Sequence, residues 1–354
     1  GISKCLAEER EWEAHSLLMI QQALQHLENA TDLPSLEQLY KTAMEKASGY
    51  FSRRESVLTM HQFCCKCRDT AILWAIRSEL ASAGESPTPF ALCALGNHGR
   101  MEATLSSPSD LLLVYGNTDL AGEEWFSGFA DNISRTLDSL GLLAPLVRID
   151  DPEWRGNLAL WKSRIAMQAG TPDPSSETVS LCDLRPVSGD PELAMALRSM
   201  AHISLKSDPL TFMSAMRAAS IMPVGFNFFG RLKMEKSGNH RGGFNLIQFA
   251  LTPMVVTVRM LAIQKSLEET STPDRIRRLL NSGELGVDLA SKLLRAYHDF
   301  HRIKLAAEVS GKGTERKGFY LDREEISHDD ETCLKQGLEA LFNLQRIVYQ
   351  SVES

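Results

Sequence analysis

Several features are scarce or missing in this sequence of 354 residues. Lysine and arginine total 38 against 45 aspartate and glutamate residues, which gives a net charge of -7. This balance argues against a role in binding nucleic acid, because a protein that coats a phosphate backbone usually carries a basic excess. The seven cysteines lack the paired spacing of a secreted disulfide framework. We therefore expect free thiols and a reducing, cytoplasmic location.

The sequence also lacks an uninterrupted apolar run of membrane-spanning length. The longest candidate, residues 244–263, contains Asn245, Gln248, Pro253 and Arg259, which favours a buried core helix and no membrane association. The chain begins with glycine rather than methionine, so we expect it to be trimmed from a longer protein. No signal-peptide pattern follows, and we find neither an internal repeat nor a low-complexity segment.

What the chain has in abundance is helical periodicity. Residues 1–84 carry apolar side chains at helical spacing and predict three helices, with a break near residues 32–35. Residues 84–89 form a linker rich in glycine, serine and proline. From residue 191 onward helices predominate again. A length of 354 residues is comfortable for two or three domains.

The stretch between residues 90 and 115 has a different pattern. Two apolar runs, residues 90–95 and 111–115, predict two buried strands joined by a polar crossing. The first run ends in G-N-H-G-R, whose glycines allow backbone amides to approach an anion, while Arg100 adds a planar fork suited to phosphate. Asp110 immediately precedes the second apolar run. A carboxylate there is what Mg²⁺ bound to a triphosphate prefers.

This stretch resembles the nucleotidyltransferase domain of the protein-PII uridylyltransferases. It is more similar still to relatives that follow CBS and cyclic-nucleotide-binding domains in bacterial signalling proteins, within the DNA polymerase beta-like superfamily. The family pattern is G-x-x-G-R-x-E followed by a D-x-D strand. The matching residues are Gly96, Gly99, Arg100, Glu102, Thr104, Leu105 and Asp110. Two positions depart from the pattern, because Asn97 replaces a Gly or Ser and Pro108 replaces the first Asp.

A second run, D-L-R-P-V-S-G-D from Asp183 to Asp190, resembles the family segment that supplies the third active-site carboxylate. By the resemblance, that carboxylate is Asp183. From the residues alone, an aspartate between Cys182 and Leu184 is costly to bury unless a cation pairs with it. Arg185 therefore offers a structural ion pair as the alternative to a catalytic role.

Three arginines are candidate substrate contacts. Arg155 lies in a W-R-G-N element similar to the family's, although Trp154 is explained equally well by core packing. Arg185 lies two residues after Asp183. Arg231 lies within residues 228–245, which resemble the relatives' C-terminal domain and whose alternation predicts a β-ribbon with a solvated edge.

The resemblance covers nearly the whole chain and implies an α+β fold that is predominantly helical. It implies a small mixed β-sheet nucleotidyltransferase core flanked by an N-terminal helical region and a C-terminal helical bundle. We expect three parts, namely a helical lead-in over residues 1–84, a nucleotidyltransferase-like domain over 85–190 and a substrate-binding-like domain over 191–354. The helical ends would support a homodimer.

By the same resemblance, a working member transfers a nucleotidyl group from an NTP to a protein hydroxyl, for instance on a PII-like regulatory protein. Nucleotide binding falls on Gly96, Asn97, Gly99, Arg100 and Glu102, and catalysis and metal binding fall on Asp110 and Asp183. The family uses two Mg²⁺ ions, whereas the proline at 108 predicts one ion or none here.

Three outcomes stay open for this site. In the first, Glu102 substitutes as a metal ligand and the protein is a slow enzyme. In the second, one metal ion still binds an NTP but no reaction follows. In the third, the site is vestigial. The function is then either that of a degenerate nucleotidyltransferase in signal transduction or that of a non-catalytic nucleotide-binding regulatory or interaction module.

Two other groups of potential metal ligands are better explained by packing. Cys64, Cys65 and Cys67 follow one another on a predicted helix, but a structural zinc site needs a second ligand pair that the sequence lacks. Small buried thiols account for them. His298 and His301, one helical turn apart, are likewise interpreted as a structural pair rather than a metal site.

Overall fold

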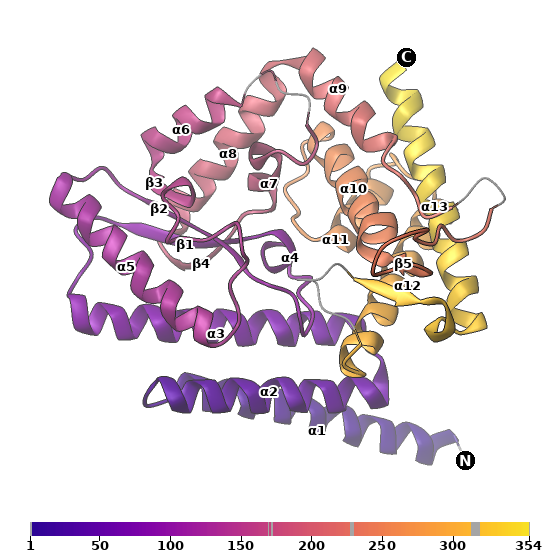
Figure 1. Cartoon of the computed structure of the whole chain (residues 1–354), viewed down its shortest axis with the longest axis horizontal. Helices are drawn as coiled ribbons and strands as arrows, with labels where there is room; N and C mark the ends of the chain where they lie inside the picture. Colours follow the sequence, from indigo (N-terminus) through magenta and orange to yellow (C-terminus); the bar gives the residue numbers. More distant parts are fainter. Residues whose placement is uncertain (1, 169, 171–172, 227–229, 313–318, 354) are drawn as a thin grey trace.

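The computed structural model describes residues 2–168, 170, 173–226, 230–312 and 319–353, and Figure 1 shows their arrangement. The N-terminal region forms three long helices, α1 (Ile2–Glu28), α2 (Leu33–Arg54) and α3 (Val57–Ala83). The break between the first two falls where the sequence predicts it. Asp32 caps α2 there by accepting a 2.8 Å hydrogen bond from the backbone N–H of Ser35.

A mixed sheet of four strands forms the centre of the molecule, in the order β3-β2-β1-β4. All six residues of the first strand are buried, as expected for a strand covered on both faces. It pairs antiparallel with both of its neighbours, whereas β3 joins β2 in parallel. The strands are β1 (Phe90–Leu95), β2 (Asp110–Tyr115), β3 (Arg155–Asn157) and β4 (Arg185–Gly189).

Helices pack around this sheet, and the fold is α+β and predominantly helical, as predicted. In Figure 1, α3 and α5 run below the sheet and α6 and α8 lie above it. The rings of Phe126 and Phe129 on α5 pack against Phe90 of β1. The elements of this region are α4 (Gly96–Gly99), α5 (Leu120–Ser139), η1 (Pro152–Trp154), α6 (Leu158–Met167), α7 (Glu177–Ser180), η2 (Leu181–Asp183) and α8 (Pro191–Ser207).

The C-terminal region is a helical bundle in which α12 and α13 lie side by side (Figure 1). The predicted ribbon over residues 228–245 is found only in part. Glu235 exchanges backbone hydrogen bonds of 2.9 Å with Gly242 and Gly243 across the predicted turn, but the strand of this segment that the structure describes, β5, pairs with β6 from a distant part of the chain. Phe228 and Phe229 lie outside the described residues. The elements are α9 (Pro209–Ser220), β5 (Gly243–Asn245), η3 (Ile247–Leu251), α10 (Thr252–Gln264), α11 (Thr272–Asn281), α12 (Val287–Val309), β6 (Tyr320–Asp322), η5 (Arg323–Glu325) and α13 (His328–Glu353).

Two predictions about buried residues agree with the packing. The apolar segment Ile247–Gln264 is, among the described residues, the one helix long and apolar enough to cross a membrane, and 72% of it is buried inside the fold. Cys64, Cys65 and Cys67 are fully buried in the core. Burial raises the pKa of the Cys64 thiol to about 11 and that of Cys65 to about 12, so these thiols are neutral near pH 7.

Candidate functional site

The glycine turn at the end of β1 lies between the two predicted carboxylates. Gly96 has a φ of +54°, and a side chain there would clash with the carboxylate of Asp110. A side chain at Gly99 would clash with the backbone oxygen of Asp183. Sheet pairing adds to this arrangement, because Asp110 lies opposite Leu95. The fold thus brings Asp110 and Asp183 to opposite flanks of one short turn.

Asp183 has no exposed surface, and three arginines surround its carboxylate. Oδ2 accepts hydrogen bonds from Arg100 Nη1 at 2.9 Å and from Arg259 Nη1 at 2.8 Å. Arg275 Nη1 lies 2.7 Å from Oδ1. Burial alone would raise the pKa of Asp183, but the three guanidinium groups outweigh burial and hold that pKa well below its usual range. We call Asp183 with Arg100, Arg259 and Arg275 the arginine cage.

Arg100 is committed to several partners at once. Besides Asp183, its Nε donates to Glu102 Oε2 at 2.8 Å and its Nη2 donates to Asn97 Oδ1 at 2.7 Å. Glu102 is itself buried, and its second carboxylate oxygen accepts a hydrogen bond from the backbone N–H of Thr272 at the start of α11. Moving Glu102 to a metal would break both contacts.

The partner of Arg185 differs from the one that the sequence offered as an alternative. Both of its terminal nitrogens bind the carboxylate of Asp69 on α3, at 3.0 and 2.9 Å. Asp69 also lies 2.8 Å from Nε2 of His98 in the glycine turn. Asp183 is therefore held by more distant arginines, and Arg185 instead anchors the turn to α3. Sequence analysis missed Asp69, because nothing local marks its partners.

The loop that precedes Asp110 is held from two sides. Arg68 of α3 donates to the backbone oxygens of Thr104 and Ser107, each at 2.8 Å. From α12, Lys304 donates to the hydroxyl of Thr104 at 2.8 Å, and that hydroxyl donates to Glu308 at 2.7 Å. These charged residues, all missed by sequence analysis, fix the loop to both helical regions.

A cavity of about 290 Å³ opens between the glycine turn and the C-terminal helices. The glycine turn, α10 and α12 all contribute polar or charged groups, and α10 and η3 also contribute aliphatic ones. Its volume is close to the lower end of the range for small-molecule pockets. Lining residues include Asn97, Arg100, Glu102, Ser175, Ser180, Ile247, Leu251, Thr252, Val255, Val256, Arg259, His301 and Lys304.

Two predicted substrate contacts lie away from this cavity. Arg155 donates to Ser127 at 2.9 Å and to the backbone oxygen of Ile149 at 3.2 Å, and it lines a separate pocket of about 350 Å³ beside β3. Arg231 is exposed in the segment before β5. Neither arginine lines the cavity at the glycine turn.

Parts of this chain are similar in sequence to known protein families and to three known enzymes. A family described as "Putative nucleotidyltransferase DUF294" matches residues 41–175, and one described as "Putative nucleotidyltransferase substrate binding domain" matches residues 209–352. Bifunctional glutamine synthetase adenylyltransferase/adenylyl-removing enzymes of Bifidobacterium longum subsp. infantis and of Bifidobacterium longum strains DJO10A and NCC 2705 are 27% identical over 109 residues. That alignment covers 29% of this chain and 10% of each enzyme, so the chain spans about a tenth of the length of these relatives.

The donor atoms beside the turn do not fit a pair of magnesium ions. Both oxygens of Asp183 face guanidinium groups, and the side chain of Pro108 has no atom that could ligate a metal. Within the described parts of the chain, no group of three His, Cys, Asp or Glu side chains is placed to hold a metal ion. Asp110 is the one remaining carboxylate of the predicted set that is partly exposed.

Proposed function

We propose that this chain, which belongs to the nucleotidyltransferase family defined by these two matches, binds a nucleoside triphosphate beside the glycine turn without transferring its nucleotidyl group. It would then act as a nucleotide-binding regulatory module. The family fold supplies the turn and the strand pair. This chain differs from the family pattern in its carboxylates, because Pro108 replaces the first one and Asp183 is held by arginines.

The observation that carries this proposal is the arginine cage. A metal ion at Asp183 would have to replace buried guanidinium groups, whose own charges would then lose their main partner. Removing one partner of a buried ion pair typically costs about 3–5 kcal/mol. The cage is therefore stable against metal entry, and the proline at position 108 removes a second donor.

The cavity is lined by both charged and aliphatic side chains, and this combination supports nucleotide binding. The guanidinium of Arg259 and the ammonium of Lys304 offer positive charge to phosphate oxygens. Among the described residues that line the cavity, three cations (Arg100, Arg259 and Lys304) outnumber the one carboxylate (Glu102). The aliphatic wall formed by Ile247, Leu251 and Val256 suits the face of a base. Binding of this kind needs no metal.

The alternative is nucleotidyl transfer to a partner protein, such as a PII-like regulator. Asp110 favours nucleotidyl transfer, because this carboxylate of the family pattern is retained at the first residue of β2 and is partly exposed. A single ion at Asp110 would be the minimum requirement. The two functions differ in whether nucleotide binding depends on metal.

Calorimetric titration of the four NTPs in the presence of EDTA tests the proposal. Val255 lines the cavity and is only partly buried, so Val255→Phe fills the space without disturbing the cage. Val287, which is 70% exposed at the start of α12, provides the matched control Val287→Phe. We expect saturable binding to the wild type and to Val287→Phe, and at least tenfold weaker binding to Val255→Phe. Absence of binding without metal, or equal binding by both variants, would overturn the proposal.

A further inference from the structure

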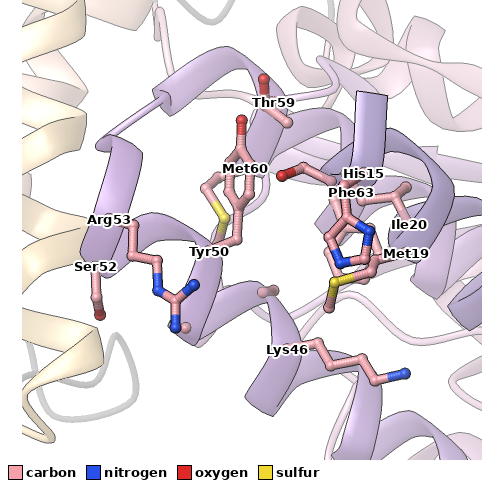
Figure 2. A pocket seen from close by; sticks show the side chains of 13 residues that line it. His15, Met19, Ile20, Lys46, Tyr50, Ser52, Arg53, Thr59, Met60 and Phe63 are labelled. Carbon is pink, nitrogen blue, oxygen red and sulfur yellow. The ribbon is translucent and has the colours of Figure 1, made fainter. Parts of the chain in front are cut away.

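A third cavity, of about 420 Å³, lies between the N-terminal helices, apart from the glycine turn (Figure 2). Its walls come from α1, α2 and α3. The interior is apolar and aromatic, formed largely by Met19, Ile20, Tyr50, Met60 and Phe63. Its volume lies within the range of small-molecule pockets. Methionine side chains are flexible and polarizable, so such walls adapt to varied apolar shapes.

The charged side chains among the described residues that line this cavity are all basic. Lys46 and Arg53 of α2 lie at its edge together with His15 of α1, as Figure 2 shows, and no Asp or Glu is among the described residues that line it. Neither Lys46 nor Arg53 forms an ion pair with any residue that the structure describes. Lys46 is half-buried. Among the residues that the structure describes, the cavity thus combines an apolar interior with positive charge that no carboxylate of its lining offsets.

We propose that this cavity binds an amphipathic organic acid, with the apolar body between the three helices and the acid group at Lys46 and Arg53. The charge sets the sign of the ligand, and the apolar walls exclude a small, fully hydrated anion. This site is independent of the nucleotide function proposed above.

The position of the cavity connects it to the glycine turn through one helix. Met60 and Phe63 line the cavity from α3. Between them, His61 of the same helix places Nδ1 3.1 Å from the backbone oxygen of Ala103, in the loop that precedes Asp110. A ligand in the cavity would therefore contact the helix that also holds this loop.

Decanoate is a suitable probe, and decanol is its uncharged counterpart. The chain offers a cavity-filling variant at Gly49 of α2, where an added Cβ would meet no atom within 4 Å. Leucine there would occupy the open space and also favour the helix by roughly 1 kcal/mol. Gly128 of α5 has the same open surroundings but lies outside the cavity, so Gly128→Leu is the matched control.

Calorimetry should show saturable decanoate binding to the wild type and to Gly128→Leu. Gly49→Leu should weaken that binding at least tenfold. Lys46→Met should weaken decanoate about fivefold while leaving decanol unchanged. The proposal fails if the wild type shows no saturable binding, if Gly49→Leu binds decanoate as the wild type does, or if decanol binds the wild type as tightly as decanoate.

Discussion

Replacing Asp183 with asparagine tests the arginine cage directly. Asparagine has nearly the same shape as aspartate and retains one oxygen acceptor, so the packing is preserved and the negative charge is lost. Arg259 would keep a 3.2 Å hydrogen bond to the backbone oxygen of Pro174, and Arg275 would keep contacts to backbone oxygens. Both arginines would lose the carboxylate of Asp183 as their ion-pair partner.

The size of the effect follows from burial. Asp183 is fully buried, and the side chains of Arg100, Arg259 and Arg275 are at most 7% exposed. Leaving buried cations without their partner costs about 3–5 kcal/mol. Typical domains unfold with a free energy of about 5–15 kcal/mol, so Asp183→Asn should remove a large part of the stability.

Urea denaturation followed by tryptophan fluorescence measures this loss. Asp119→Asn is the control, because Asp119 caps the exposed start of α5 by accepting from the N–H of Gly122 at 2.9 Å, and asparagine caps equally well. We expect the control to match the wild type. A free energy of unfolding for Asp183→Asn within about 1 kcal/mol of the wild type would refute the buried-cage account.

The pH dependence gives a second readout of the same residue. The pKa of Asp183 is depressed in the folded protein, so its contribution is present above the unfolded pKa of about 3.9 and is lost as pH falls through the folded value. The stability difference between the wild type and Asp183→Asn should therefore shrink below about pH 4. A difference that stays constant into that range would contradict the assigned cause.

Three further predictions concern the surroundings of the cage. Burial lowers the pKa of His61 to about 4, so as the pH falls the unfolded chain binds a proton at this histidine before the folded chain does. The free energy of unfolding should therefore fall by about 3 kcal/mol between pH 6.5 and 4. His61→Asn should make the urea midpoint less dependent on pH in that window. Glu308→Gln should cost about 3 kcal/mol in urea, since the Lys304 side chain beside it is 3% exposed, whereas Asp288→Asn, in an exposed pair with Lys292, should change nothing measurable. Pro108→Asp should not release pyrophosphate from any NTP, because Asp183 stays caged; turnover in that variant would show that the proline alone disables the site.

Local patterns were enough to predict much of the fold. Continuous apolar runs predicted the first two strands, helical spacing predicted the long helices, and two glycines predicted the turn that Asp110 and Asp183 flank. Each of these signals depends on residues close together in the sequence. The family resemblance then added the small mixed sheet and its two helical flanks, but not the order of the strands.

The cage itself could not be predicted in the same way. Arg259 and Arg275 reach Asp183 from 76 and 92 residues away, so no local spacing connects them. One signal was present, because an arginine in the middle of an apolar helix must find an acceptor when it is buried. That signal predicts that Arg259 has a partner, but not which carboxylate it is. Asp69 escaped notice for the same reason.

The most direct test of the central claim follows the fate of bound nucleotide. The wild-type protein is incubated with each NTP, labelled at the α-phosphate, together with Mg²⁺ or Mn²⁺ and candidate acceptor proteins, and both the bound label and released pyrophosphate are measured. The arginine cage predicts that the label is retained on the protein non-covalently and recovered as intact NTP, with no pyrophosphate. Metal-dependent release of pyrophosphate with covalent labelling of an acceptor would contradict it.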